Sequence, residues 1–361
     1  MVSPSHLDER IAARIAPLLP ARSSILIGLS GGVDSVVLLH LLHKLAARFS
    51  WRLSALHVHH GISPNADAWA KFCADLCARH QIPLSIEHVD IAPLRGHGIE
   101  AAARKLRHAA FAAQACDFVA LAHHADDQAE TLLLQLLRGA GVRGAAAMPL
   151  TKRLVRHTTS PHAGEASPAL NTSKRPLFVG NTVVGRVLTR HVGLKPDLRS
   201  NGLSGLKNAC TGSIVRPLLH CSRREILDYA AAHGLRWIDD ESNADDSYPR
   251  NFLRHRVLPL LEQRFPSYRD TLARSAQHFA EASELLDDLA RLDAAQTIED
   301  ETLTVAALQA LNQPRAKNLL RYLLHVRGAP MPQAVQLDDM LRQLCDARQD
   351  AEVCIAYGDW Q

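Results

Sequence analysis

The chain has 361 residues, a formal net charge of +4, 47% hydrophobic residues and 22% charged residues, which is typical of a soluble globular protein of two or more domains. No apolar run approaches the roughly 18 residues of a membrane span, so we expect a cytoplasmic protein without a membrane partner. The seven cysteines are scattered without a C-x-x-C pair, which argues against a disulfide framework or a zinc ribbon.

Strands and helices alternate through the first 150 residues. Short apolar runs at 24–29, 53–59, 84–90 and 117–123 predict strands, and the segments after them predict helices. This alternation implies right-handed crossovers and a parallel sheet covered on both faces. The predicted fold is therefore α/β, with a doubly wound, parallel five-stranded sheet of order 3-2-1-4-5. A last strand near 214–219 completes it.

A basic segment, residues 151–213, interrupts this rhythm. It holds ten Lys and Arg against two acids and shows no sustained period, so we predict a flexible insertion, with a hairpin at 177–190 as an open alternative. Its charge suits a polyanion, although a solvated surface explains the charge equally well.

The rest of the chain is predicted to be mostly helical. Ser222 and Glu225 form a capping box that begins a helix, which Gly234 ends. A helix kinked at Pro259, a long amphipathic helix from 268 to about 295 and two or three shorter helices in 303–347 follow. The predicted organisation is a first domain over 1–150, the insertion over 151–213 and a helical domain over 220–361.

A Gly-rich loop joins the first strand to the first long helix of the sheet domain. Glycines let a backbone approach an anion, and a helix N-terminus supplies free N–H groups and a positive dipole. Asp34 would repel phosphate directly, so we expect it to hold a Mg²⁺ ion that bridges phosphates. The loop lacks the G-K-[ST] end of a Walker A motif, and a Ser-capped Gly-Gly turn is the alternative. Its residues are Ser30, Gly31, Gly32, Val33, Asp34 and Ser35.

The hexapeptide SGGVDS resembles the signature of the N-type ATP pyrophosphatases, the PP-loop family, whose members split ATP into AMP and pyrophosphate. The hexapeptide alone does not choose among the synthetases and tRNA-modifying enzymes of that family.

A second polar segment, HHADDQAET, follows the fourth strand at 123–131. In a doubly wound sheet, ligands bind beyond the carboxyl ends of the strands, so this segment should face the Gly-rich loop. Asp127 and Glu130 lie three apart on one helical face and suit Mg²⁺ or an ammonium group. Simple capping of the helix is the alternative. Zinc binding by His123 and His124 is disfavoured because neighbouring side chains on a strand end point in opposite directions.

Longer strings narrow the resemblance to the tRNA(Ile)-lysidine synthetases, in order from about residue 20 to 290 apart from the insertion. They are SGGVDS (30–35), HVHHGIS (57–63), EAAARKLRHAAF (100–111), HHADDQAETLLLQLLRGAGVRGAAAM (123–148), VRPLL (215–219), WIDDESN (237–243) and YPRNFLRHRVLPLL (248–261). The resemblance implies a C–N ligase that uses ATP and Mg²⁺. In this family the O2 of the wobble cytidine attacks the α-phosphate of ATP, and the ε-amine of L-lysine then displaces AMP. The implied RNA is an isoleucine tRNA with a CAU anticodon.

The resemblance also implies roles for single residues. Ser30 to Ser35 would hold pyrophosphate, and His57 and His59 would contact adenosine unless they are only exposed histidines at a strand end. Asp127 and Glu130 resemble the acids that hold the lysine ammonium group. Arg104 and Arg107 would offset charge on the α-phosphate or reach tRNA, with a solvated helix face as the alternative. The catalytic candidates are Asp34, Arg104, Arg107, Asp127 and Glu130.

Three residues of the helical domain are candidates for tRNA contact. Arg250, Asn251 and Arg254 share a helical face, and the alternative is a salt-bridge network with the acids of WIDDESN, Asp239, Asp240 and Glu241. Two features depart from the family pattern: the insertion at 151–213, and an end at GDWQ, where a further C-terminal tRNA-binding domain is usual. The remaining alternatives are another PP-loop tRNA-modifying enzyme or a truncated nucleotide-binding remnant without turnover.

Overall fold

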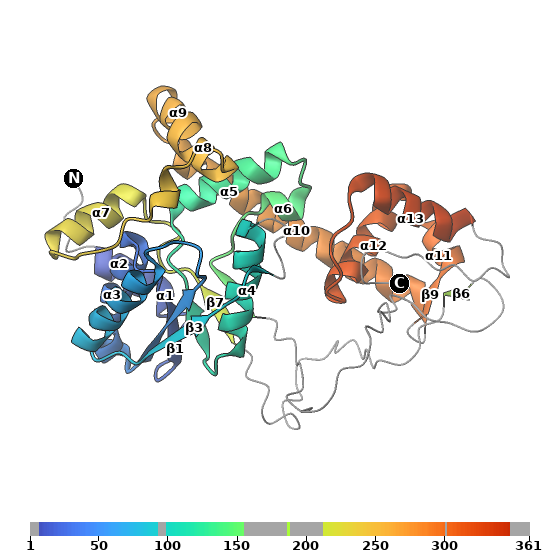
Figure 1. Ribbon diagram of the computed structural model, residues 1–361. Coiled ribbons are helices and arrows are strands. Elements are labelled where there is room, and N and C mark those ends of the chain that lie inside the picture. Colours follow the sequence, from blue (N-terminus) through green and yellow to red (C-terminus); the bar gives the residue numbers. More distant parts are fainter. Residues whose placement is uncertain (1–6, 93–98, 155–185, 188–211, 300–301, 347–361) are drawn as a thin grey trace. The chain divides into compact units, whose positions relative to one another are not determined.

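The computed structural model describes residues 7–92, 99–154, 186–187, 212–299 and 302–346 (Figure 1). The chain divides into two compact units, the first made of Met1–Ser160 and Gly205–Ala280 and the second of Pro161–Ser204 and Glu281–Gln361. Most of the insertion predicted at 151–213, and all of the hairpin predicted at 177–190 except residues 186–187, lie outside the described residues.

A six-stranded sheet forms the centre of the first unit, in the order β3-β2-β1-β4-β7-β5. The first five of these strands are parallel, which confirms the predicted order 3-2-1-4-5. The predicted count of five strands was wrong, because β5 adds an antiparallel edge strand beside β7. Its three residues are all exposed, so no apolar alternation marks it in the sequence. The strands are β1 Ser24–Gly28, β2 Arg52–His59, β3 Leu84–His88, β4 Phe118–Ala120, β5 Thr151–Arg153 and β7 Ser213–Val215.

Apolar side chains cover both faces of this sheet. Alternate residues of a strand point to opposite faces, so Ile25 and Ile27 belong to one core cluster and Leu26 to another. The first cluster takes its helical members from α1 Leu7–Ile15, α2 Val33–Phe49, α3 Ala66–Arg79 and α7 Arg223–Ala232. The second cluster includes Phe111 of α4 Ile99–Ala113. The sheet is therefore doubly wound, as the alternation of strands and helices predicted.

The predicted capping box at the start of α7 is confirmed. The Ser222 hydroxyl accepts a hydrogen bond from the Glu225 amide at 3.2 Å, and the Glu225 carboxylate accepts one from the Ser222 amide at 2.8 Å. The helix ends at Ala232, and Gly234 takes a positive φ of 59° just beyond it. These bonds satisfy amides that the first turn leaves open, so the start of α7 is fixed locally.

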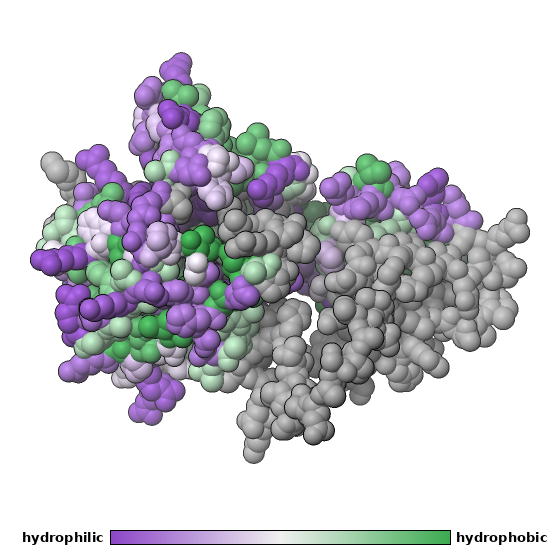
Figure 2. Space-filling view, in the orientation of Figure 1, coloured by the Kyte–Doolittle hydropathy of each residue, from purple (hydrophilic) through white to green (hydrophobic). Residues whose placement is uncertain are grey.

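The first unit also contains several helices and helical turns whose described residues belong to neither core cluster of the sheet. They are α5 Ala125–Leu137, α6 Val142–Ala145, the 3₁₀ helix η3 Glu241–Ala244, α8 Pro249–Phe252, the π-helical turn η4 Leu253–Val257, α9 Leu258–Arg264 and the start of α10 Tyr268–Thr297. The irregularity predicted at Pro259 is the π-helical turn just before it. Phe252, Leu260 and Phe265 are exposed along this segment, and hydrophobic groups stand among hydrophilic ones at α9 in Figure 2.

The second unit has a helical core of its own. Buried leucines of α11 Val305–Ala310, α12 Gln313–Val326 and α13 Ala334–Asp346 pack together, as the predicted short helices require. A small antiparallel sheet joins β6 Arg186–Val187, β9 Thr302–Thr304 and β8 Ile298–Glu299. The buried carboxylate of Asp293, on α10, pairs with Arg315. Across the part of the chain that the structure describes, every helix is too short or too polar to cross a membrane.

Candidate active site

A cavity of about 480 Å³ opens at the carboxyl edge of the sheet in the first unit. Segments that follow β1, β2 and β4 line it, and so does the helix α4. This is the edge at which the strand order reverses, with β1 between β2 and β4. The fold therefore brings the Gly-rich loop and the HHADDQAET segment to one hollow, as their places after strands 1 and 4 predicted.

The Gly-rich loop has a conformation that its residue types explain. Gly31 has a φ of 92°, and a Cβ atom there would lie 2.5 Å from the Cδ1 atom of Ile238. Only glycine combines that φ with so close a neighbour at low cost. The Ser35 hydroxyl accepts a hydrogen bond from the Gly31 amide at 3.1 Å and donates one to the Gly32 carbonyl at 2.9 Å. The loop is thus pre-shaped at the N-terminus of α2, where the free amides favour an anion.

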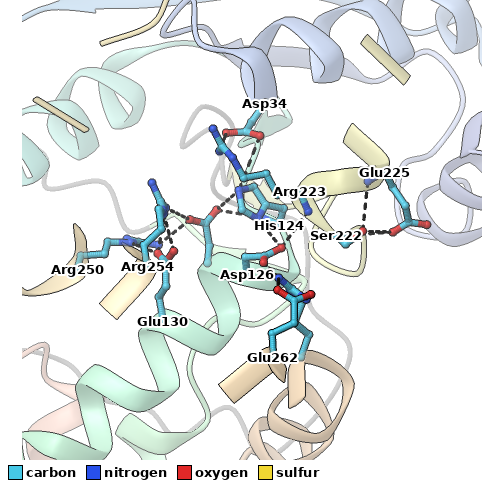
Figure 3. Close-up of polar contacts among 12 residues, drawn as sticks. Asp34, His124, Asp126, Glu130, Ser222, Arg223, Glu225, Arg250, Arg254 and Glu262 are labelled. Carbon is cyan, nitrogen blue, oxygen red and sulfur yellow. Dashed lines mark hydrogen bonds and ion pairs between the residues drawn. The ribbon is translucent and has the colours of Figure 1, made fainter. Parts of the chain in front are cut away.

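Asp34, in the first turn of α2, lies at the meeting point of three segments (Figure 3). Its Oδ2 atom lies 3.4 Å from Nη1 of Arg223, and its Oδ1 atom lies 3.7 Å from Nε2 of His124. Burial raises the pKa of the Asp34 carboxyl, and the charges of His124 and Arg223 act in the opposite direction. Oδ1 is buried and accepts no hydrogen bond within the described residues. A hard cation such as Mg²⁺ fits this orphaned carboxylate oxygen.

Asp127 and Glu130 form an ion-pair cluster with two arginines. Figure 3 shows Glu130 between Arg250 and Arg254. Glu130 has no exposed surface, and its two carboxylate oxygens lie 2.6 Å from Nε of Arg250 and 2.7 Å from Nε of Arg254. The Oδ1 atom of Asp127 lies 2.8 Å from Nη2 of Arg250 and 3.4 Å from Nη2 of Arg254. Two carboxylates thus meet two guanidinium groups, so the cluster carries no formal net charge. Below, these four residues are called the acidic cluster.

Neighbouring groups lower the pKa of Asp127. Burial alone raises the pKa of Asp127, but the charges of His124 and Arg250 and the hydrogen bond from the His124 amide outweigh it, and the pKa falls to about 2. Asp127 therefore stays ionised throughout the physiological range. Of the four members, only Asp127 lines the 480 Å³ cavity among the described residues.

The other predicted site residues divide into those that line the cavity and those that do not. His57, His59, Arg104 and Arg107 line it, together with Ser30, Gly32, Asp34 and Ser35. His57 is buried, and its Nδ1 atom shares a hydrogen bond of 2.9 Å with the Leu29 carbonyl, while His59 pairs with Asp67. Asn251 donates to the Asp245 carbonyl at 2.9 Å and so fixes the turn before α8.

Sequence reasoning missed three side chains that the fold brings to this region. His124, considered from the sequence only as a disfavoured zinc ligand, is buried between Asp34, Asp126 and Asp127. Arg223 contacts Asp34 and donates its amide to Asp126 at 2.9 Å. In the sequence, Arg223 could have been noticed only because it directly follows Ser222, in the first turn of the helix that the capping box begins. Arg216 follows β7, and its signal was a single cation inside an apolar run.

Comparison with known proteins finds two family matches. Residues 5–177 and 188–261 match the PP-loop domain, and residues 303–361 match the TilS substrate binding domain. A protein of Nitrosomonas europaea named tRNA(Ile)-lysidine synthase is 41% identical over 349 residues, covering 97% of this chain and 65% of the relative. One of the same name from Azoarcus sp. is 41% identical over 334 residues, covering 92% and 62%. The chain thus spans less than two thirds of the length of these relatives.

Among solved structures, the U34-tRNA thiolase NcsA from Methanococcus maripaludis is similar in fold. Its TM-score is 0.51 at 16% identity, with 77% of this chain and 79% of that chain covered. At this level of identity the likeness concerns the fold alone.

Proposed function

We propose, from the premise that this chain belongs to the PP-loop family, that it ligates L-lysine to C2 of the wobble cytidine of an isoleucine tRNA with a CAU anticodon. The proposed reaction takes place in the cytoplasm and consumes ATP. Cytidine O2 attacks the α-phosphate and pyrophosphate leaves, and then the lysine ε-amine attacks C2 and AMP leaves. The observation that carries this proposal is the shared cavity of the Gly-rich loop and Asp127, in a chain 41% identical to relatives named tRNA(Ile)-lysidine synthase.

In this proposal, the Gly-rich loop holds the β- and γ-phosphates. Its open amides stand at the start of α2, and Ser30 and Ser35 add hydroxyl groups that line the same cavity. Asp34, whose Oδ1 atom has no hydrogen-bond partner within the described residues, would hold a Mg²⁺ ion, and the ion would neutralise charge on the phosphates. His57, His59, Arg104 and Arg107 line the remainder of the nucleotide site.

In this proposal, Asp127 binds the lysine ammonium group, and Glu130 positions Asp127. Asp127 is ionised and lines the cavity, whereas the Glu130 carboxylate is wholly buried against Arg250 and Arg254. The proposed tRNA contact of Arg250 and Arg254 is therefore indirect, because both guanidinium groups face the two acids. An incoming ammonium shares Asp127 with these arginines, which favours an amine that can hydrogen-bond closely over a bulkier cation.

One assay separates this function from its alternatives: release of pyrophosphate, measured with and without L-lysine and a CAU-anticodon tRNA(Ile) transcript. We expect pyrophosphate release that needs the RNA. AMP should be the nucleotide product, and lysine should become attached to the RNA. Asp127→Asn should raise the lysine requirement much more than the ATP requirement, since a buried amine loses its counter-charge.

Three outcomes contradict the proposal. Stoichiometric ADP and phosphate exclude the PP-loop chemistry. RNA-dependent release that continues over many turnovers without lysine points to another tRNA-modifying reaction, since adenylation alone releases at most one pyrophosphate per RNA. Nucleotide binding without any turnover, in protein that is folded, identifies a remnant. A parallel rise in the lysine and ATP requirements of Asp127→Asn assigns this acid to Mg²⁺ instead.

A further inference from the structure

Arg216 is a buried cation that its surroundings do not neutralise. It follows β7 at the carboxyl edge of the sheet, lines the 480 Å³ cavity and is 5% exposed. Its Nη1 atom donates to the Pro149 carbonyl at 2.6 Å, which holds the guanidinium in place. Its Nε atom is buried and donates to no atom of the described residues. A buried guanidinium usually has a carboxylate partner, because removing its charge from water is costly.

The charges around Arg216 are also positive. Burial and then the charge of Arg104 lower the pKa of Arg216 to about 10, and no carboxylate contributes. His108 of α4 lies in the same surroundings. Burial and then the charges of Arg104, Arg107, Lys152 and Arg216 lower its pKa to about 4. The charges named for His108, among the described residues, all belong to cations, and such an arrangement favours the binding of an anion.

Two further nitrogen atoms in the cavity have no partner. Nδ1 of His60 and Nδ1 of His123 are buried and form no hydrogen bond within the described residues, and both rings line the cavity. An imidazole Nδ1–H can donate to an oxyanion. His123 follows β4, the strand beside β7, whereas His60 follows β2 on the far side of β1. At the Arg216 end, Nδ1 of His123 and Nε of Arg216 therefore both lack a hydrogen-bond partner within the described residues, which is uncommon for buried polar atoms.

This positive end is separate from the Gly-rich loop. The loop follows β1, whereas Arg216 follows β7, and β4 lies between these two strands. Two strand spacings amount to about 10 Å. The Gly-rich loop and Arg216 therefore face different parts of one ligand, or two ligands.

We propose that Arg216 and Arg104, with the Nδ1 atom of His123, form a second phosphate-binding subsite in the cavity. The phosphate comes either from the RNA backbone beside the target base or from the α-position of ATP. The first source rests on the proposed function for the identity of the RNA, and the second does not. The subsite would hold the phosphate by charge-assisted hydrogen bonds from a rigid guanidinium.

The test compares Arg216→Met with Arg52→Met. Arg52 is exposed at the first residue of β2, on the opposite edge of the sheet, so its replacement removes the same charge away from the cavity. We would measure the Kd of ATP, the Kd of a CAU-anticodon stem-loop RNA, protection by inorganic phosphate in thermal unfolding, and the Tm without ligand. None of these readouts requires lysine ligation.

Arg216→Met should weaken one phosphate ligand by about 10- to 100-fold, the effect of losing one or two hydrogen bonds to a charged group. A loss confined to ATP assigns the subsite to the α-phosphate, and a loss confined to RNA assigns it to the backbone. Protection by inorganic phosphate should fall in either case. The Tm without ligand should stay level or rise, because an unpaired buried cation is replaced by an apolar side chain.

Two results would overturn the proposal. One is equal binding of ATP, RNA and inorganic phosphate by Arg216→Met and Arg52→Met. The other is a Tm that falls by several degrees without ligand, which would mean that Arg216 only anchors the Pro149 carbonyl. Arg104→Met provides a second variant on an exposed helix position, and it should weaken the same ligand as Arg216→Met; no effect on that ligand counts against the subsite.

Discussion

Among the described residues, buried charges are paired in one region of the site and unpaired in another. At one end, Asp127 and Glu130 face Arg250 and Arg254 at distances of 2.6–3.4 Å, and the formal charges cancel. At the other end, Arg216 is equally buried, but its charged neighbour is a second cation, Arg104. The acidic cluster is complete within the chain. The positive end becomes complete only with an anion.

This difference separates a charge that stabilises the fold, Glu130, from a charge that is proposed to bind a ligand, Arg216. A neutral buried cluster resists the removal of any member, because the remaining partners keep their desolvation cost without their attraction. An uncompensated charge gives the reverse expectation, since its removal relieves the free protein and weakens the complex. Stability and ligand affinity should therefore respond in opposite ways at the two ends.

The largest effect on stability is expected for Glu130→Gln. The change leaves two half-buried guanidinium groups without their main counter-charge at a wholly buried position, and breaking such a cluster costs on the order of 3–5 kcal/mol of unfolding free energy. The control is Glu9→Gln, which breaks the exposed pair with Arg48 and should cost less than about 1 kcal/mol. Urea unfolding of both variants measures this. Similar small losses in Glu130→Gln and Glu9→Gln would show that the acidic cluster does not stabilise the fold.

Asp34→Asn should separate activity from stability. Pyrophosphate release is expected to fall by about 100-fold or more, the usual effect of losing a group that stabilises developing charge. The unfolding free energy should change little, because burial already disfavours the charged form of Asp34 and asparagine has the same shape. Steady-state rates and urea unfolding on one preparation give both numbers. Unchanged turnover removes Asp34 from the Mg²⁺ site.

Two histidines that line the cavity, His60 and His108, should make stability depend on pH between about 4 and 6.5. His60 and His108 have folded pKa values of about 4 against an ordinary 6.5, with burial as the largest cause and nearby arginines as the next. The folded state thus binds fewer protons than the unfolded state in this window, so stability rises with pH and is lost as pH falls from 6.5 towards 4.

His108→Gln should flatten that slope in unfolding measurements across the same pH range. Arg216→Met should also flatten it, by removing one of the charges that lower the pKa of His108. A slope that both variants leave unchanged would mean that other groups control acid unfolding.

The smallest effect is expected for Ser222→Ala, at about 1 kcal/mol of unfolding free energy. The capping box fixes the start of α7, and the next residue, Arg223, contacts Asp34. The variant therefore tests whether a local cap also supports the site. Thermal unfolding gives the stability, and the Kd of Mg²⁺–ATP gives the effect on the site. A cost near zero would show that α7 begins correctly without the cap.

Local patterns in the sequence were enough for the elements that depend on near neighbours. SGGVDS specified a loop between a strand and a helix, because glycine conformations and free helix amides act over a few residues. Ser222 and Glu225 marked a helix start for the same reason. The alternation of strands and helices then gave the parallel order of five strands, because crossover handedness leaves few alternatives. The edge strand β5 had no such pattern, since its exposed residues are selected only by backbone pairing with β7.

The charge partners were decided by the tertiary structure. Asp127 and Arg250 lie 123 positions apart, and the sequence suggested nearer acids, in WIDDESN, as the alternative partners of Arg250. Arg216 looked like one cation in an apolar run, but the fold buries it beside Arg104. The energy of a buried charge depends on which distant groups replace the lost water. Sequence therefore determined where the site forms, and only tertiary packing decided which of its charges are paired.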